Sequence, residues 1–115
     1  MKKIVLTVAI TMAFGIPVVR ADDHIEAKKI CQDFVYKRLK APSTARFEPL
    51  INVAAQPTKD KKWKKMKNVW DSIGWVDSQN SFGAMIRSEY MCTVQKLPNN
   101  SWKLLDLYWF KEPLQ

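Results

Sequence analysis

Two cysteines, Cys31 and Cys92, have the best-defined chemistry in this chain of 115 residues. An even number of cysteines in an exported protein predicts a disulfide, and two cysteines permit only one intramolecular bond. Such a bond would close a loop of about 60 residues and stabilise the fold by roughly 4 kcal/mol. Two unpaired thiols, or a bond between two chains, are the alternatives. A metal site is not predicted, because there is no CxxC pair and His24 is the only histidine.

A run of lysines around one tryptophan is the strongest candidate binding site. It lies in the segment KDKKWKKMK, residues 59–67, which holds six lysines and one aspartate. Lysines beside an aromatic ring can hold an anionic surface while the ring stacks or inserts. A solvated loop that only keeps the protein soluble is the alternative. The residues of this lysine cluster are Lys59, Lys61, Lys62, Trp63, Lys64, Lys65 and Lys67.

A second candidate site lies in the polar stretch that follows Trp75 and Val76. Its residues are Asp77, Ser78, Gln79 and Asn80. We predict that they belong to a loop over residues 77–83, where several side-chain donors and acceptors lie close together. Loops held on a rigid scaffold often bind ligands, but the same side chains can simply satisfy backbone groups of a turn. The second interpretation is favoured.

Catalysis is not predicted by any residue pattern. A hydrolase needs a nucleophile with a base in reach. His24 would be the third residue once residues 1–21, a predicted signal peptide, are removed, and chain ends fray. A carboxylate pair needs two acidic side chains close together, and no spacing in the sequence brings two together. We therefore expect a protein that is not an enzyme and that uses no cofactor.

The first 21 residues have the pattern of a secretory signal peptide. Lys2 and Lys3 form its basic start, residues 4–19 its apolar stretch, and small residues its cleavage site. An uncleaved membrane anchor is the alternative, although a spanning helix needs about 20 apolar residues and this stretch is broken by a glycine and a proline. We predict a periplasmic or secreted bacterial protein of one small domain, residues 22–115, with no transmembrane segment after cleavage.

After removal of the predicted signal peptide, the net positive charge of the chain equals that of one short segment. Without Lys2, Lys3 and Arg20, 16 basic and 11 acidic residues remain, so the net charge is +5. The segment 59–67 has the same net charge by itself. Outside the cytoplasm the available anions are acidic proteins, lipid headgroups and envelope polymers, so we expect one of these as partner and not a nucleic acid.

The periodicity of apolar residues predicts one helix followed by strands. Residues 22–40 have an apolar helical stripe, and Lys28 is expected to face water. The stripe consists of Ala27, Ile30, Cys31, Phe34, Val35 and Leu39. Residues 43–47 are interpreted as a connector. Strands are predicted at residues 50–54, 69–76, 84–94 and 102–110.

Together these elements predict an α+β fold with an N-terminal amphipathic helix packed on a three- to four-stranded antiparallel sheet. The helical stripe places Cys31 toward the core. The alternation of the strand at 84–94 independently places Cys92 on the inward face. The disulfide would therefore join the helix to the sheet.

Two blocks, CQDFVYKRLKAPSTARF (31–47) and GWVDSQNSFGAMIRSEYMCTV (74–94), resemble a small bacterial domain of unknown function found in exported or membrane-tethered proteins. The resemblance rests on the K-x-PSTA-x-F and VDSQNSFGA patterns and on the two cysteines, and covers about 40 of the 94 mature residues. It implies that the two blocks form one linked scaffold, and it implies no activity.

We expect a non-enzymatic binding protein that presents the lysine cluster. Its partner would be an acidic protein, as for an inhibitor, immunity or exclusion factor, or an anionic envelope component. The alternative is an accessory subunit of an envelope assembly that makes contact through an aromatic sheet face, because residues 102–110 carry large apolar side chains on both faces. The oligomeric state does not follow from the sequence.

Overall fold

Within the residues that the structure describes, all the strands follow one helix. The computed structural model describes residues 22–111, and the predicted signal peptide lies outside them. The elements are α2 (Asp23–Tyr36), β1 (Ala41–Phe47), η1 (Leu50–Asn52), β2 (Ala54–Pro57), η2 (Lys61–Trp63), β3 (Val69–Gln79), β4 (Met85–Lys96) and β5 (Trp102–Lys111).

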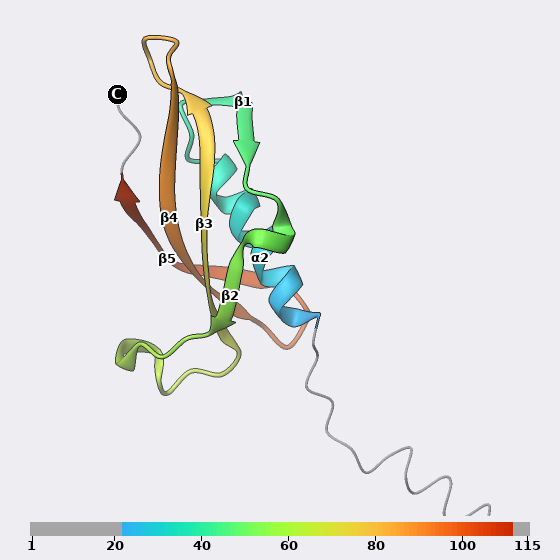
Figure 1. Cartoon of the computed structure of the whole chain (residues 1–115). Coiled ribbons are helices and arrows are strands. Elements are labelled where there is room, and N and C mark those ends of the chain that lie inside the picture. Colours follow the sequence, from blue (N-terminus) through green and yellow to red (C-terminus); the bar gives the residue numbers. More distant parts are fainter. Residues whose placement is uncertain (1–21, 112–115) are drawn as a thin grey trace, which may run out of the picture.

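Five strands form one antiparallel sheet in the order β1-β3-β4-β5, and β2 also pairs with β3. β1 and β2 share one edge of β3, because Phe47 lies opposite Val76 and Ala54 lies opposite Ile73. α2 lies across one face of the sheet and contacts all five strands (Figure 1). The expected α+β arrangement is confirmed, but the sheet has five strands rather than three or four.

The additional strand is β1, in the segment interpreted as a connector. Pro42 has no N–H for a ladder, which an edge strand tolerates. The hydroxyl of Thr44 replaces part of this ladder, since it donates to the carbonyl of Ala41 at 2.6 Å and accepts from the amide of Gln79 at 2.9 Å. The register accordingly breaks between Ala41 and Arg46.

Two further predictions of strand and loop boundaries are wrong. Residues 50–54 are not a strand: the amide of Val53 donates to the carbonyl of Leu50 at 3.2 Å and closes the turn η1, and β2 begins only afterwards. Residues 77–79 are not a loop, because their pairing with β4 continues to the end of β3. Only residues 80–84 form the turn.

The apolar stripe of the helix is confirmed. Ala27, Cys31 and Val35 are fully buried in the core, and Ile30 and Phe34 pack against it. The helix is shorter than expected and ends at residue 36 rather than residue 40, because the chain must leave it and turn before β1 begins.

The expectation that Lys28 faces water is wrong. Its side chain is buried, and Nζ donates a hydrogen bond to the carbonyl of Leu50 at 3.0 Å. One turn further along the same side of the helix, Nε2 of Gln32 donates to the carbonyl of Glu48 at 3.1 Å. These two bonds tie α2 to the connection between β1 and β2.

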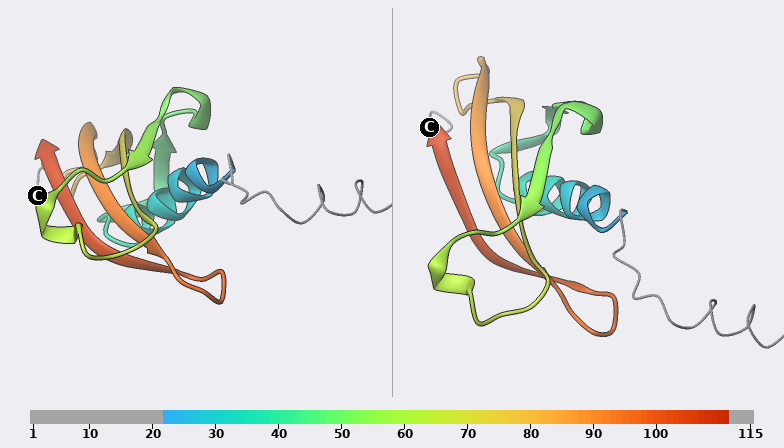
Figure 2. Two further views of the ribbon diagram at one scale, coloured as in Figure 1. Left: turned by 90° about the horizontal axis from the view of Figure 1, so that it is seen from below. Right: turned by 60° about the horizontal axis from the view of Figure 1, so that its bottom comes forward.

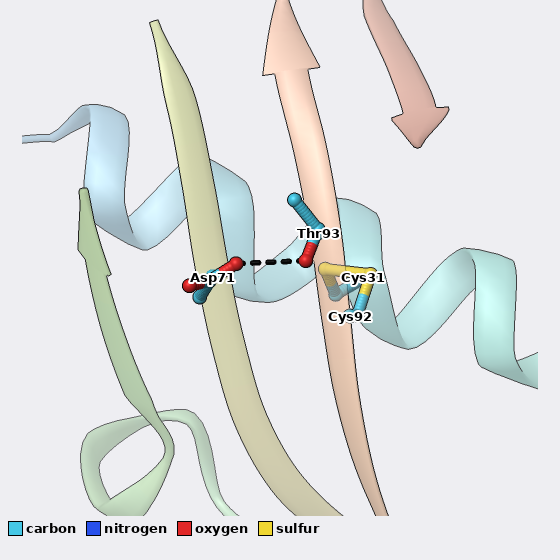
Figure 3. The surroundings of a disulfide bond; sticks show 4 residues. All are labelled: Cys31, Asp71, Cys92 and Thr93. Atoms are coloured by element: carbon cyan, nitrogen blue, oxygen red, sulfur yellow. Dashed lines mark hydrogen bonds between the residues drawn. A yellow bond between two sulfur atoms is a disulfide. The ribbon is translucent and has the colours of Figure 1, made fainter. Parts of the chain in front are cut away.

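The predicted disulfide between Cys31 and Cys92 is confirmed and joins α2 to β4 (Figure 3). Both cysteines are fully buried, so both periodicities place their sulfurs correctly. The bond lies within the core, whose buried members are Ala27, Cys31, Val35, Leu39, Val76, Tyr90, Cys92 and Val94. Trp70, Trp102 and Trp109 pack against this core from the sheet.

Candidate binding surfaces

The lysine cluster lies on the loop between β2 and β3, which contains η2. This loop projects away from α2 in all three views (Figures 1 and 2). Asp60 stabilises its start: its carboxylate accepts from the amide of Lys62 at 2.9 Å, and its own amide donates to the hydroxyl of Thr58 at 3.2 Å. All six lysines are exposed. The loop therefore presents their charges to solvent from a hydrogen-bonded turn.

Trp63 is half-buried at the centre of the lysine cluster. Its ring lies 5.2 Å from Nζ of Lys62, a cation–π contact. Trp63 also borders a hollow of about 280 Å³ at the base of the loop. The hollow is lined by Pro57, Thr58, Trp63, Lys64, Met66, Asn68, Val69 and Trp70. The ring of Trp63 therefore lies among the lysines, and its half-buried side chain also lines the hollow at the base of the loop.

The sheet face opposite α2, which we call the open face, carries a row of large apolar side chains. Cys92 points to the helix, so the next row along the strands points away from it. Ile73, Met91 and Tyr108 lie opposite one another in this row. Ile73 is 40% exposed and Tyr108 is 53% exposed. Phe110, 54% exposed, packs edge-on against Tyr108 at 5.2 Å between ring centroids.

Polar residues border this apolar row on both sides. Toward the lysine cluster, the hydroxyl of Thr93 donates to the carboxylate of Asp71 at 2.7 Å (Figure 3). On the other side, the guanidinium of Arg87 lies 3.7 Å from the ring centroid of Trp75. Arg87 also holds Asp77 with two hydrogen bonds, at 2.7 and 2.9 Å.

The hydrogen bonds from Arg87 lower the pKa of Asp77 below its usual range. The same pair raises the pKa of the Arg87 guanidinium. Both groups are therefore charged at neutral pH, and each charge is matched by the other. Arg87 thus contacts both Asp77 and Trp75. At this end of the open face, the charged groups of Arg87 and Asp77 therefore already have partners within the protein.

The four residues predicted as a loop site have structural partners. Asp77 is paired with Arg87, Ser78 is buried, and the amide of Gln79 donates to the hydroxyl of Thr44. Asn80 accepts two hydrogen bonds from amides of the turn that follows, those of Phe82 and Ala84. None of the four side chains is thereby shown to bind a ligand, and those of Asp77 and Asn80 hold the end of the β3–β4 hairpin.

β1 pairs with the end of β3, and this pairing brings the two sequence blocks, residues 31–47 and 74–94, together. Between them lies a shallow hollow of about 510 Å³. Arg46 lies here on the edge strand, and it was missed because its position beside Asp77 depends on the register of β1. Arg87 and Tyr108 were missed because their neighbours depend on the register between β3, β4 and β5, although alternation along their strands is a signal that places both on the open face. The hollow is lined by Ser43, Thr44, Ala45, Arg46, Asp77, Gln79 and Met85.

Lys96 at the end of β4 ties the start of α2 to the sheet. Its Nζ lies 2.8 Å from a carboxylate oxygen of Asp23 and 3.1 Å from one of Glu26. Hydrogen bonds to Asp23, and then to Glu26, raise the pKa of Lys96. Negative charge in the first helical turn is favourable in its own right, so these two carboxylates have structural roles.

A buried polar group lies beneath the helix where β3 and β4 are adjacent. The hydroxyl of Tyr90 is buried and makes no well-aligned hydrogen bond within residues 22–111, although the side chain of Gln32 lies close enough to it to act on its pKa. Burial raises the pKa of this phenol, the charge of Glu48 raises it further, and the nearby side chain of Gln32 offsets part of this rise. Gly74 lies opposite Tyr90 on β3. The close approach of the two makes this position sensitive to substitution.

The fold and these surfaces define a disulfide-linked α+β scaffold with one sheet face covered by a helix and the other carrying exposed side chains. No protein-family model, curated protein or solved structure matches the chain. Between residues 22 and 111, no helix is long and apolar enough to cross a membrane. What the protein binds must therefore be inferred from the surfaces themselves.

Proposed function

We propose that this chain is a non-enzymatic binding protein of the bacterial periplasm or exterior, and that it docks an acidic partner protein. The apolar row of the open face supports this proposal most directly. Exposed apolar side chains that gather on one face are typical of protein interaction sites. Ile73, Tyr108 and Phe110 form such a group around the half-buried Met91, whereas the helix covers the opposite face.

Charge supports an acidic partner. The lysine cluster lies at the end of the open face, and Asp71 and Asp106 are the acidic residues on that end of the sheet. When these two and Asp60 are counted with the six lysines, the region still has a net charge of +3. A positive rim around an apolar centre speeds association with an acidic surface and orients it.

Export supports the location. The predicted signal peptide would direct the chain out of the cytoplasm, and a buried disulfide is typical of proteins from oxidising compartments. An inhibitor, immunity or exclusion factor is a non-enzymatic protein of this kind, which acts by binding to the surface of its partner protein. The alternative is an accessory subunit that uses the apolar row without help from the lysines.

Replacing Lys61, Lys62, Lys64 and Lys65 by alanine is expected to weaken binding about 30-fold at low salt. This value assumes about 0.5 kcal/mol for each exposed charge contact. Affinity capture from envelope extract, followed by titration of the recovered protein, measures the change. A matched variant removes four exposed charges from the helix side instead: Lys29, Lys37, Arg38 and Lys40 to alanine.

Salt separates the candidate functions. For an acidic partner, wild-type binding weakens steeply between about 0.05 and 0.5 M NaCl, because exposed charges are screened, and the four-lysine variant loses most of this dependence. An accessory subunit held by the apolar row would show little dependence on salt in either form. Equal affinities of the wild type and the four-lysine variant would exclude the proposed role of the lysine cluster. Capture of lipid or polymer would exclude a protein partner.

A further inference from the structure

The β3–β4 hairpin ends in a tip, residues 80–84, that carries one strongly exposed aromatic ring. Phe82 is 85% exposed, more than any other aromatic side chain between residues 22 and 111. The tip lies at the opposite end of β3 from the lysine cluster (Figure 1). A strand of this length separates them by roughly 35 Å, so the tip is a separate surface.

Hydrogen bonds hold the tip in one conformation. Oδ1 of Asn80 accepts from the amide of Phe82 at 2.9 Å and from that of Ala84 at 3.1 Å. The amide of Gly83 donates to the carbonyl of Asn80 at 3.0 Å, and its φ of +84° is one that glycine adopts freely. The backbone on either side of Phe82 is therefore ordered before any partner arrives, which lowers the entropic cost of docking.

The hairpin end carries no charge. The nine residues from Ser78 to Ile86 include no acidic or basic side chain. The flanking charges, Asp77 and Arg87, are paired with each other at 2.7 Å. Burying an unpaired charge is costly, so an uncharged tip can enter an apolar pocket without this penalty.

We propose that this tip is a wedge, with Phe82 as the anchor that enters an apolar pocket of the partner protein. Aromatic side chains in such pockets commonly supply a large part of the binding energy of an interface. A lipid surface fits less well, because membrane-binding segments combine several apolar side chains with basic ones. Here Phe82 and Met85 are the two large exposed apolar side chains, and Asn80 and Ser81 are polar. The only basic neighbour in the hairpin, Arg87, is paired with Asp77.

The proposal rests on the proposed function for the existence of a protein partner, but its contacts are distinct from those of the lysine cluster. Phe82→Ala is expected to weaken binding of the captured partner by about 30-fold or more, with no change in the salt dependence. Phe82→Leu should lose less, because it keeps an apolar side chain. Ile51→Ala is the matched control, since Ile51 is 88% exposed on η1 and lies outside the tip; its affinity should equal that of the wild type.

Photo-crosslinking locates the contact. The full chain with benzoylphenylalanine in place of Phe82 is expected to form one adduct in the envelope, with the same protein that the wild type captures, at residues that line an apolar pocket. An adduct with phospholipid, many different adducts, or none would overturn the wedge. So would self-association abolished by Phe82→Ala, which would place the pocket on a second copy of this chain.

Failure of the wedge is distinguishable from failure of the proposed function. If the four-lysine variant loses affinity and Phe82→Ala does not, the wedge alone is overturned. If both variants bind as the wild type does, the acidic-partner proposal loses its charge contact as well. The melting temperature of each variant confirms that the exposed substitutions leave the fold intact.

Discussion

A chain in which Cys31 and Cys92 are both replaced by alanine is expected to be less stable than the wild type by about 4 kcal/mol. The bond joins residues 61 positions apart, so its loss lets the unfolded chain explore many more conformations. A domain of this size has roughly 5 to 10 kcal/mol in total. The melting temperature should therefore fall by roughly 20 °C.

Urea unfolding followed by circular dichroism measures this change. The midpoint should fall, and the dependence on urea should steepen, because an unfolded chain without the crosslink exposes more surface. A reducing agent provides the internal control: it should destabilise the wild type once the buried bond opens, and should leave the double-alanine chain unchanged. Equal free energies of unfolding in water for the two chains would show that the bond contributes nothing to stability.

The pairing of Cys31 with Cys92 was predictable because each cysteine belongs to a strong local pattern. A stripe at helical spacing and an alternating strand each fix an inward face without knowledge of the other. The helix, β3, β4 and β5 were predictable for the same reason. Five of the six apolar positions named in the helix stripe pack in or against the core within α2, and Leu39 is buried just after it.

β1 and the environment of Lys28 were not predictable in this way. β1 contains Pro42 and pairs irregularly, and it becomes a strand only because the edge of β3 is free beside it and Thr44 completes the hydrogen bonding. Lys28 is buried because η1 supplies a carbonyl 22 positions away. Both depend on contacts between distant segments, which no local pattern contains.

The same distinction applies to the candidate sites. The lysine cluster is contiguous in sequence, so its position on one loop was predictable. The open face is assembled from Ile73, Met91 and Tyr108, one residue from each of three strands, and only the register across β3, β4 and β5 shows that they form a row. The role of Asn80 was partly predictable, since asparagine often satisfies turn amides.

Gly74→Ala is expected to cost about 2 kcal/mol of stability, because the new methyl group has no room. A Cβ at this position would lie 2.8 Å from the hydroxyl oxygen of Tyr90 and 3.2 Å from its Cζ. Tyr90 cannot move aside easily, since its side chain is fully buried and packs edge-on against Trp109. The absence of a side chain at residue 74 is thus what admits the Tyr90 hydroxyl.

Tyr90→Phe removes this hydroxyl and should raise stability by about 1 kcal/mol, because a buried polar group that makes no well-aligned hydrogen bond is lost. In the Tyr90→Phe background the cost of Gly74→Ala should fall by about 1 kcal/mol; some cost remains because the ring carbon stays close. Gly83→Ala is the control, since no heavy atom lies within 4 Å of its added Cβ. Its effect should add to that of Tyr90→Phe. Urea unfolding of all the single and double variants measures the coupling, and additive effects at Gly74 and Tyr90 would show that the hydroxyl does not set the glycine requirement.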